Sequence, residues 1–154
     1  MLVSICTIAR NEEGYLPHLL DDITKQDFPA GQIEVVMVDS GSKDGTRGIM
    51  ENFAEKNSQF YNCTVTENPG DNQASGWNQA IRTSTGDIII RLDAHGRIPT
   101  DFVSKNVECM GKRRRCYRRT KTKSSGKGHT VAATSFKCRK FNVWKWDCRF
   151  SQEK

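Results

Sequence analysis

The stretch from Gly86 to His95 reads GDIIIRLDAH, and it decides the fold. Three isoleucines give way abruptly to polar residues, which predicts a buried strand that ends in an acid and an imidazole two residues apart. Ligands of open α/β sheets bind outside the carboxyl ends of the strands. We therefore predict that Asp93 and His95 share one metal ion. The plainer alternative is that Asp93 begins a turn and His95 is a solvated loop residue.

Two longer apolar runs and one weaker run precede this stretch. Residues 2–8 lead into the polar sequence RNEE, and residues 33–38, IEVVMV, end at Asp39. A continuous apolar run is typical of a parallel strand that is buried on both faces. A shorter and weaker strand is predicted over residues 61–66.

Segments with helical spacing of apolar residues alternate with these strands. We expect Asn11 to be the N-cap of the first helix and Asp44 to be available as a cap for the second. Gly45 is expected to tolerate positive φ in the turn before that second helix. The first predicted helix carries apolar residues at positions 16, 19, 20 and 23 and the second at positions 49, 50 and 53, and two further helices are predicted over residues 74–83 and about 100–109.

The repeated order of strand, polar loop, helix and strand predicts the fold class. Right-handed crossovers between such strands build a mostly parallel sheet with helices on both faces. We predict an α/β, Rossmann-like half-domain.

Charge divides the chain of 154 residues at about Met110. Residues 1–110 have a net charge of −7 and residues 111–154 have +13, which together make the overall +6. We predict one domain over residues 1–110 and a basic tail over residues 111–154. No apolar run reaches the roughly 18 residues that a membrane span needs, so we expect a cytoplasmic protein. Six cysteines without C-x-x-C spacing do not indicate a zinc site, and we expect most of them to be reduced.

Three of the predicted strands end in polar side chains on what must be one edge of the sheet. Glu12 and Asp39 could accept hydrogen bonds from a base and a ribose, and a divalent ion on Asp93 and His95 could offset the charge of a diphosphate. This combination fits a sugar nucleotide. A dinucleotide dehydrogenase is disfavoured because no G-x-G-x-x-G follows the first strand, and the phosphate-cradling G-x-x-x-x-G-K-[ST] loop is absent as well.

Four motifs in this order resemble the family 2 glycosyltransferases of GT-A fold. They are VSICTIARNEE, VVMVDSGSKDGT, NPGDNQASGWNQAIRTSTGDIII and RLDAH, and together they cover nearly all of residues 1–108. DAH in place of the commoner D-x-D resembles the subgroup that assembles bacterial exopolysaccharides of the succinoglycan type. The resemblance implies transfer of a sugar from a nucleotide-diphospho-sugar, most simply a UDP-sugar, to a growing polysaccharide or a lipid-linked acceptor. Full-length relatives often work at the inner face of the plasma membrane.

The resemblance also implies roles for individual residues. Asp39 would contact the base, Asp93 would serve the ribose or the metal, and His95 would stand where a second acid usually binds the metal. The ion would be Mn²⁺ or Mg²⁺, and an imidazole with a carboxylate suits Mn²⁺ somewhat better. The full predicted set for nucleotide binding is Thr7, Ala9, Asn11, Glu12, Asp39, Ser40, Asn72, Asn78, Arg91, Asp93 and Ala94, with Asp93 and His95 as metal ligands.

Plainer interpretations stand beside several of these roles. Asn11, Asp39 and Asp44 could be caps and turn formers only. Trp77 is expected in the core rather than as a platform for a sugar. Arg91 could contact a phosphate or neutralise neighbouring acids.

Residues 111–154 show neither a family motif nor apolar periodicity. One interpretation is a non-enzymatic arm that binds nucleic acid, since clustered Lys and Arg bind phosphates without sequence specificity. We favour another, in which a single-base frameshift near Met110 replaced the acceptor half and the general base that family members carry there. The tail would then be mostly disordered, and transfer by this chain negligible, leaving weak binding of a UDP-sugar.

The nucleotide sequence of the gene tests the frameshift. Read one base later, the tail permits codons for EKEEDVIGGPKPN and, further on, AESSMFGSGIADFR, both of which resemble the family. We expect the gene to encode sequence of this kind in the offset frame after codon 110. An offset frame without GGPKPN-like coding contradicts the hypothesis.

Overall fold

The computed structural model describes residues 1–70, 72–112, 132–137 and 144–149. Four parallel strands form the main sheet in the order β3-β2-β1-β4. They are β1 Val3–Ala9, β2 Ile33–Asp39, β3 Asn62–Glu67 and β4 Ile88–Asp93. The helices are α1 Leu16–Thr24, α2 Thr46–Lys56, α3 Gln73–Thr83 and α4 Phe102–Lys112, with a 3-10 turn at Ala30–Gln32.

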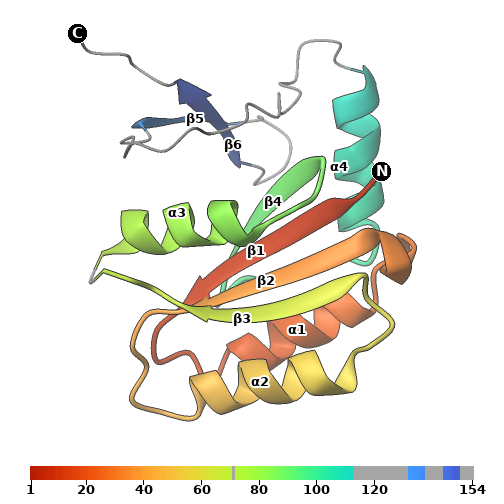
Figure 1. Cartoon of the computed structure of the whole chain (residues 1–154). Helices are drawn as coiled ribbons and strands as arrows, with labels where there is room; N and C mark the ends of the chain where they lie inside the picture. The colour runs from red at the N-terminus through yellow and green to blue at the C-terminus, as the bar shows by residue number, and fades with distance from the viewer. Residues whose placement is uncertain (71, 113–131, 138–143, 150–154) are drawn as a thin grey trace, which may run out of the picture.

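The helices cover both faces of the sheet, as predicted. Figure 1 shows α3 on one face and α1 with α2 on the other. Each predicted strand and helix is present, although α4 begins two residues later than expected and ends three residues later. The predicted α/β, Rossmann-like fold is confirmed.

Residues 132–137 and 144–149 form β5 and β6, which pair antiparallel in a separate sheet. These strands lie in the segment for which the sequence suggested no regular structure. Residues 113–131, 138–143 and 150–154 lie outside the described part of the chain, so the expected disorder of the tail remains a prediction.

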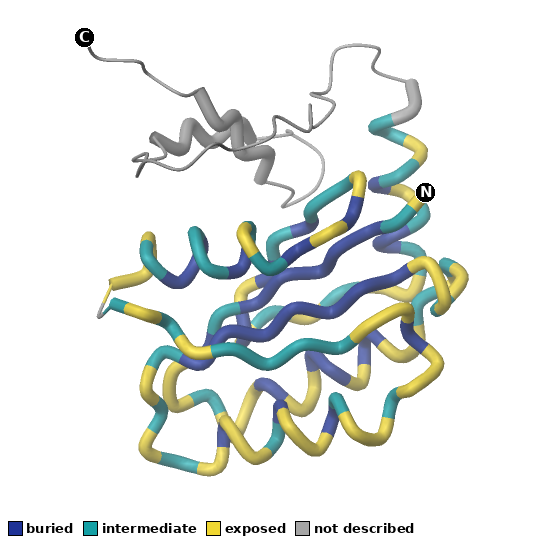
Figure 2. Tube along the Cα trace, viewed as in Figure 1, coloured by how far each residue is buried: buried dark blue, intermediate teal, exposed yellow. Residues whose placement is uncertain are grey.

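The two central strands are buried on both faces. Every residue of β2 is buried, and six of the seven in β1 are; Figure 2 shows both as continuous dark tubes between more exposed neighbours. Parallel strands inside a sheet require such runs, because helices cover each face. Toward α1 and α2 the core contains Val3, Ile5, Leu16, Leu19, Ile23, Val35, Met37, Met50 and Ile90, and toward α3 it contains Cys6, Val36, Val38, Trp77 and Ala80.

The loops after β1 and β2 correct two details of the sequence interpretation and agree with a third. Asn11 does not cap α1, because Tyr15 is the N-cap and Asn11 lies four residues earlier with φ of 56°. Gly45 has φ of −71°, and the positive φ in this loop belongs to Gly41 at 73°. Asp44 does assist α2, since its carboxylate accepts the Thr46 N–H at 3.0 Å, although Gly45 is the N-cap.

A buried carboxylate interrupts the apolar run of β2. Glu34 is only 1% exposed, and its side chain accepts hydrogen bonds from the Ser4 hydroxyl and from the N–H and hydroxyl of Thr85, the last two at 2.8 and 3.0 Å. Three donors offset the cost of burying this group. Burial, and then the nearby Glu34 charge, raise the pKa of the Cys6 thiol to about 12.

Gly86 completes this cluster by donating its N–H to the Ser4 hydroxyl at 2.8 Å. A Cβ at Gly86 would lie 2.5 Å from Ser4 Oγ, 2.7 Å from Ser4 N and 3.0 Å from Leu2 O. Two of these atoms belong to the backbone and cannot rotate away. The chain between α3 and β4 therefore requires glycine at this position.

We predict that Gly86→Ala lowers the free energy of unfolding by about 1–3 kcal/mol, because the added methyl overpacks a closed site. Urea denaturation measures the change. Gly48→Ala is the matched control, since no atom lies within 4 Å of its Cβ position in α2, and it is expected to stabilise by roughly 0.5–1 kcal/mol. Equal effects of the two substitutions would contradict the close approach at Gly86.

Candidate functional site

The carboxyl ends of β1, β2 and β4 meet at one edge of the sheet. The register pairs Ala9 with Asp39 and Ile8 with Asp93, so the residues that follow each strand lie side by side. A hollow of about 300 Å³ opens at this edge. Its lining residues are Ile8, Arg10, Glu12, Ser40, Asn68, Asn72, Gln73, Asp93, Ala94 and His95. The predicted convergence of polar strand ends is confirmed.

Hydrogen bonds between backbone N–H groups and side chains join the loop after β1 to the loop after β2. Asn11 donates its N–H to Ser42 Oγ at 3.1 Å, and its amide oxygen accepts the Lys43 N–H at 2.8 Å. The Glu12 N–H donates to Thr46 Oγ1 at 2.8 Å. Because Thr46 is fully buried, this bond fixes the backbone from which the Glu12 carboxylate reaches the hollow.

A second pair of bonds joins the same two loops. The Glu13 N–H donates to Asp44 Oδ2 at 3.2 Å, and Glu13 Oε2 accepts the Gly45 N–H at 2.8 Å. Hydrogen bonds, that from Thr46 above all, hold the pKa of the Asp44 carboxyl below its ordinary value. Asp44 thus has the capping role that the plainer interpretation gave it. Asn11 joins the two loops and does not cap α1, and its contact with a nucleotide remains a prediction.

Asp39 lies at the end of β2 and is almost fully buried. Its Oδ1 accepts two hydrogen bonds from Ser42, one from the hydroxyl at 2.6 Å and one from the N–H at 3.2 Å. Ser40, the next residue, lines the hollow, whereas Asp39 borders the loop beside it. The carboxylate is therefore oriented by the turn that it closes.

Asn68 is a site residue that the sequence interpretation missed. Its N–H donates to Asp39 O at 2.8 Å, and its side-chain amide donates to Ser40 Oγ at 3.1 Å and to Asn72 O at 3.0 Å. These bonds fasten the loop before α3 to the end of β2. Asn72 is the N-cap of α3 and accepts the Ser75 N–H. The sequence signal for Asn68 was its place in the ENPGDNQ loop, which predicts a turn but not its partners.

Arg91 and Trp77 pack together beside the hollow. The Arg91 guanidinium lies 4.2 Å from the centre of the Trp77 ring, and its Nη2 lies 3.2 Å from Asp93 Oδ1. Trp77 is buried in the core beneath α3, as expected. The ion pair shows Arg91 neutralising a neighbouring acid.

His95 is an exposed residue of the predicted site, with its side chain 66% exposed. Its Nδ1 lies 3.5 Å from Glu12 Oε1, and Asp93, two residues earlier, is 48% exposed. The described residues contain no group of three or more metal-ligating side chains. A divalent ion that also binds substrate phosphates and water needs only one or two protein ligands, so Asp93 and His95 fit such an ion.

Three other predicted residues lie away from the hollow. Thr7 and Ala9 are buried on the face of β1 toward α1, and no hydrogen-bond partner for Thr7 Oγ1 lies within the described chain. Asn78 is half-buried on α3 and does not line the hollow. Ala94 does line it, with its methyl in the core.

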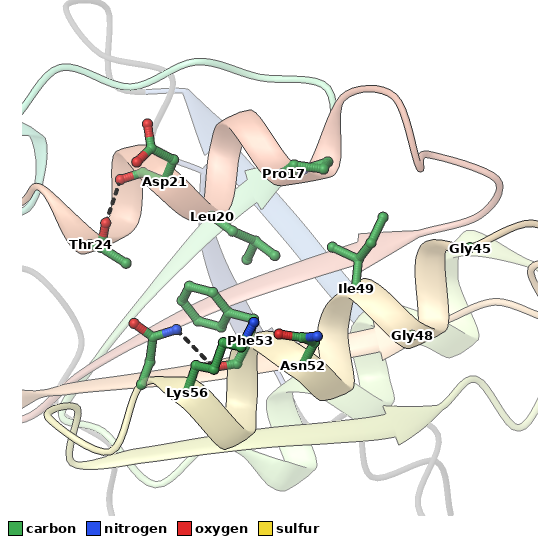
Figure 3. A pocket seen from close by; sticks show the side chains of 11 residues that line it. Pro17, Leu20, Asp21, Thr24, Gly45, Gly48, Ile49, Asn52, Phe53 and Lys56 are labelled. Carbon is green, nitrogen blue, oxygen red and sulfur yellow. Dashed lines mark hydrogen bonds between the residues drawn. The ribbon is translucent and has the colours of Figure 1, made fainter.

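A larger groove of about 530 Å³ lies between α1 and α2 (Figure 3). Its polar rim is occupied by local contacts: Thr24 donates to Asp21 O, and the Asn57 amide donates to Phe53 O. Asp21 is also paired with Lys25. The groove therefore offers no convergent set of polar groups. It is lined by Pro17, Leu20, Asp21, Thr24, Gly45, Gly48, Ile49, Asn52, Phe53, Lys56 and Asn57.

The architecture is that of the GT-A glycosyltransferases. A mannosyltransferase from Pyrobaculum calidifontis, solved with GDP-Man and Mn²⁺, matches with a TM-score of 0.64 and 32% identity over 69% of this chain and 31% of its own. The structure of Staphylococcus aureus TarS 1–349 in complex with UDP matches with a TM-score of 0.61 and 26% identity, over 73% of this chain and 32% of its own.

A family model described as Glycosyl transferase family 2 matches residues 4–149, and the chain belongs to this family. The match runs past Met110, where we expected the resemblance to end. Neither the frameshift nor the inactivity that we expect of this chain is tested by that match, and both remain predictions. The nucleic-acid-binding alternative depends on a tail that lies largely outside the described residues.

Curated relatives support the same family. One is a dolichyl N-acetyl-alpha-D-glucosaminyl phosphate 3-beta-D-2,3-diacetamido-2,3-dideoxy-beta-D-glucuronosyltransferase of Methanococcus voltae, 29% identical over 69% of this chain and 33% of its own. Another is the succinoglycan biosynthesis protein ExoA of Rhizobium meliloti, 31% identical over 64% of this chain and 29% of its own. The chain thus spans about a third of the length of these relatives. No helix in the described residues is long and apolar enough to cross a membrane.

Proposed function

We propose that this domain binds a nucleotide-diphospho-sugar, with UDP as the nucleotide, and is the donor-binding part of a glycosyltransferase that acts on a growing polysaccharide or a lipid-linked acceptor, with negligible transfer expected of this chain alone. The observation that carries the proposal is the convergence of Glu12, Asp93 and His95 around a hollow of about 300 Å³, with Asp39 at the end of the neighbouring strand on the same sheet edge. Family membership and relatives solved with UDP and GDP-Man support it.

Asp39 is the proposed partner of the base. Ser42 holds its Oδ1, so the orientation of the carboxylate is set by a contact within the protein. A carboxylate accepts hydrogen bonds and cannot donate them. It therefore suits the ring N–H of uracil and repels the acceptor nitrogen at the same position of cytosine. Ser40 and Asn72, which line the hollow nearby, are proposed to complete the nucleotide site.

Asp93 and His95 are the proposed ligands of a divalent ion, Mn²⁺ or Mg²⁺, that would neutralise charge on the departing diphosphate. Glu12, 3.5 Å from the imidazole, can accept a hydrogen bond from its Nδ1–H and leave the other nitrogen for the metal. Arg91 restrains Asp93 through their ion pair at 3.2 Å. These residues hold the site in shape without moving a proton.

For the acceptor we propose a bacterial exopolysaccharide of the succinoglycan type. The similarity to ExoA and the DAH sequence at the end of β4 support this choice. Family resemblance places the general base in the second half of such enzymes, beyond the metal motif. We assign that role to no residue of this chain.

We predict that Asp39→Asn weakens UDP binding about 10-fold or more, because a charge-assisted hydrogen bond contributes roughly 1.5–3 kcal/mol. Isothermal titration calorimetry with UDP, with CDP as the comparison ligand, measures the loss. Asp87→Asn is the matched control, since Asp87 accepts the Leu2 N–H at the opposite edge of the sheet. Tighter binding of CDP than UDP by the unsubstituted protein would contradict the role of Asp39.

We predict that His95→Ala abolishes the gain in UDP affinity that Mn²⁺ provides and leaves binding without metal within about two-fold, because His95 reaches the diphosphate only through the ion. Titrations with and without Mn²⁺ separate the two effects, and electron paramagnetic resonance of Mn²⁺ reports the ion directly. His18→Ala, an exposed histidine on α1, is the control. An unchanged Mn²⁺ effect in His95→Ala would remove His95 from the metal site.

A further inference from the structure

Asp22 is an acid on the buried face of α1, where the neighbouring Leu19 and Ile23 belong to the core. Its side chain is only 8% exposed. Its Oδ2 accepts the Arg97 Nε–H at 2.7 Å and its Oδ1 accepts Nη2–H at 2.9 Å, which makes a two-bond fork. Oδ2 also accepts the Ile98 N–H at 3.1 Å. Chiefly through Arg97, these bonds hold the pKa of Asp22 below its ordinary value.

This pair of hydrogen bonds holds the chain at Arg97, two residues after the DAH sequence. Gly96 donates its N–H to Asp93 O at 2.9 Å, so residues 93–96 close as a turn at the end of β4. Arg97 and Ile98 follow directly and are tied to Asp22. His95 therefore stands between two fixed points, one in the register of β4 and the other on α1.

Gln26, one turn after Asp22 on the chain, extends the attachment. Its amide donates to Pro99 O at 2.8 Å, and its carbonyl accepts the Val103 N–H at 3.0 Å. The segment between β4 and α4, together with the first turn of α4, is thus fastened by one side chain of α1 and by a second side chain just after α1.

The imidazole of His95 lacks comparable support of its own. It is 66% exposed, and its ion-pair contact is the one to Glu12 at 3.5 Å. Few neighbours pack against this exposed side chain, so contacts with other side chains do little to fix its position. The region that the imidazole can reach is therefore set mainly by the backbone of residue 95. The position of the backbone at residue 95 in turn depends on the turn at Gly96 and on the fork beyond it.

We propose that Asp22, acting through Arg97, is a positioning residue that holds His95 where it can bind the metal ion of the donor site. The role rests on the proposed function. Asp22 touches neither nucleotide nor ion and acts through the backbone of residues 95–98. Groups of this kind that orient a metal ligand are worth 10–100-fold in metal affinity in other proteins.

Asp22→Asn tests the role, and Asp21→Asn is its matched control. Asp21 is the adjacent residue on α1, but it is half-exposed and pairs within the helix with Lys25. We expect Asp22→Asn to bind UDP without metal within about two-fold of the unsubstituted protein and to lose about 10-fold of the gain that Mn²⁺ provides. Asp21→Asn is expected to keep both values. Calorimetry with UDP, with and without Mn²⁺, supplies the measurements.

The double variant D22N/H95A distinguishes positioning from general damage. Because His95→Ala already abolishes the Mn²⁺ gain, the informative measurement on the double variant is UDP binding without metal. If Asp22 acts only through His95, D22N/H95A binds UDP without metal as tightly as H95A alone, whereas a further loss in the double variant shows general damage and overturns the positioning role. A full Mn²⁺ effect in D22N overturns the role of Asp22, and so does an equal loss of UDP binding without metal. Absence of UDP binding by the unsubstituted protein overturns the proposed function and this role together.

Discussion

Parallel pairing of β1 with β2 on one side and β4 on the other is the constraint on which the rest of the structure depends. A parallel strand cannot be reached by a tight turn, so each connection crosses the sheet through a helix and returns to the same starting edge. The carboxyl ends of all four strands, and the polar residues that follow them, therefore lie together at the opposite edge. The helices that make the crossings bury β1 and β2 on both faces, so the carboxyl edge is where polar side chains remain accessible to a ligand.

The two edges of the sheet treat polar groups in opposite ways. At the amino edge, Glu34 is enclosed, and Ser4 and Thr85 supply donors to its carboxylate. At the carboxyl edge, the Asp93 side chain is 48% exposed and that of His95 is 66% exposed, and each has an ion-pair partner in the described chain. A satisfied buried acid stabilises one arrangement of the chain, whereas an open acid and imidazole retain capacity for a ligand. Similar residue types thus serve structure at one edge and binding at the other.

Periodicity in the sequence was sufficient to predict the strands, the helices and the meeting of their ends, because these follow from local spacing and from handedness. It was insufficient for contacts between distant residues. The Asp22–Arg97 fork joins residues 75 positions apart, and Glu34 meets Thr85 across 51. Asn11 looked like a helix cap because the same residue types, Asn among them, are common both at helix N-caps and in turns. Its left-handed backbone conformation depends on hydrogen bonds to the loop after β2, which its local sequence does not show. Asn68 was missed for the same reason.

The joining of the loops after β1 and β2 has a thermodynamic consequence. Five hydrogen bonds within the protein itself join residues 11–13 to residues 42–46. A molecule that docks against these loops meets a surface whose backbone freedom was already lost when the chain folded. Association then forfeits little conformational entropy at this edge, and more of the contact energy is retained as affinity. The free energy of folding therefore covers the ordering of these two loops, and ligand binding does not have to.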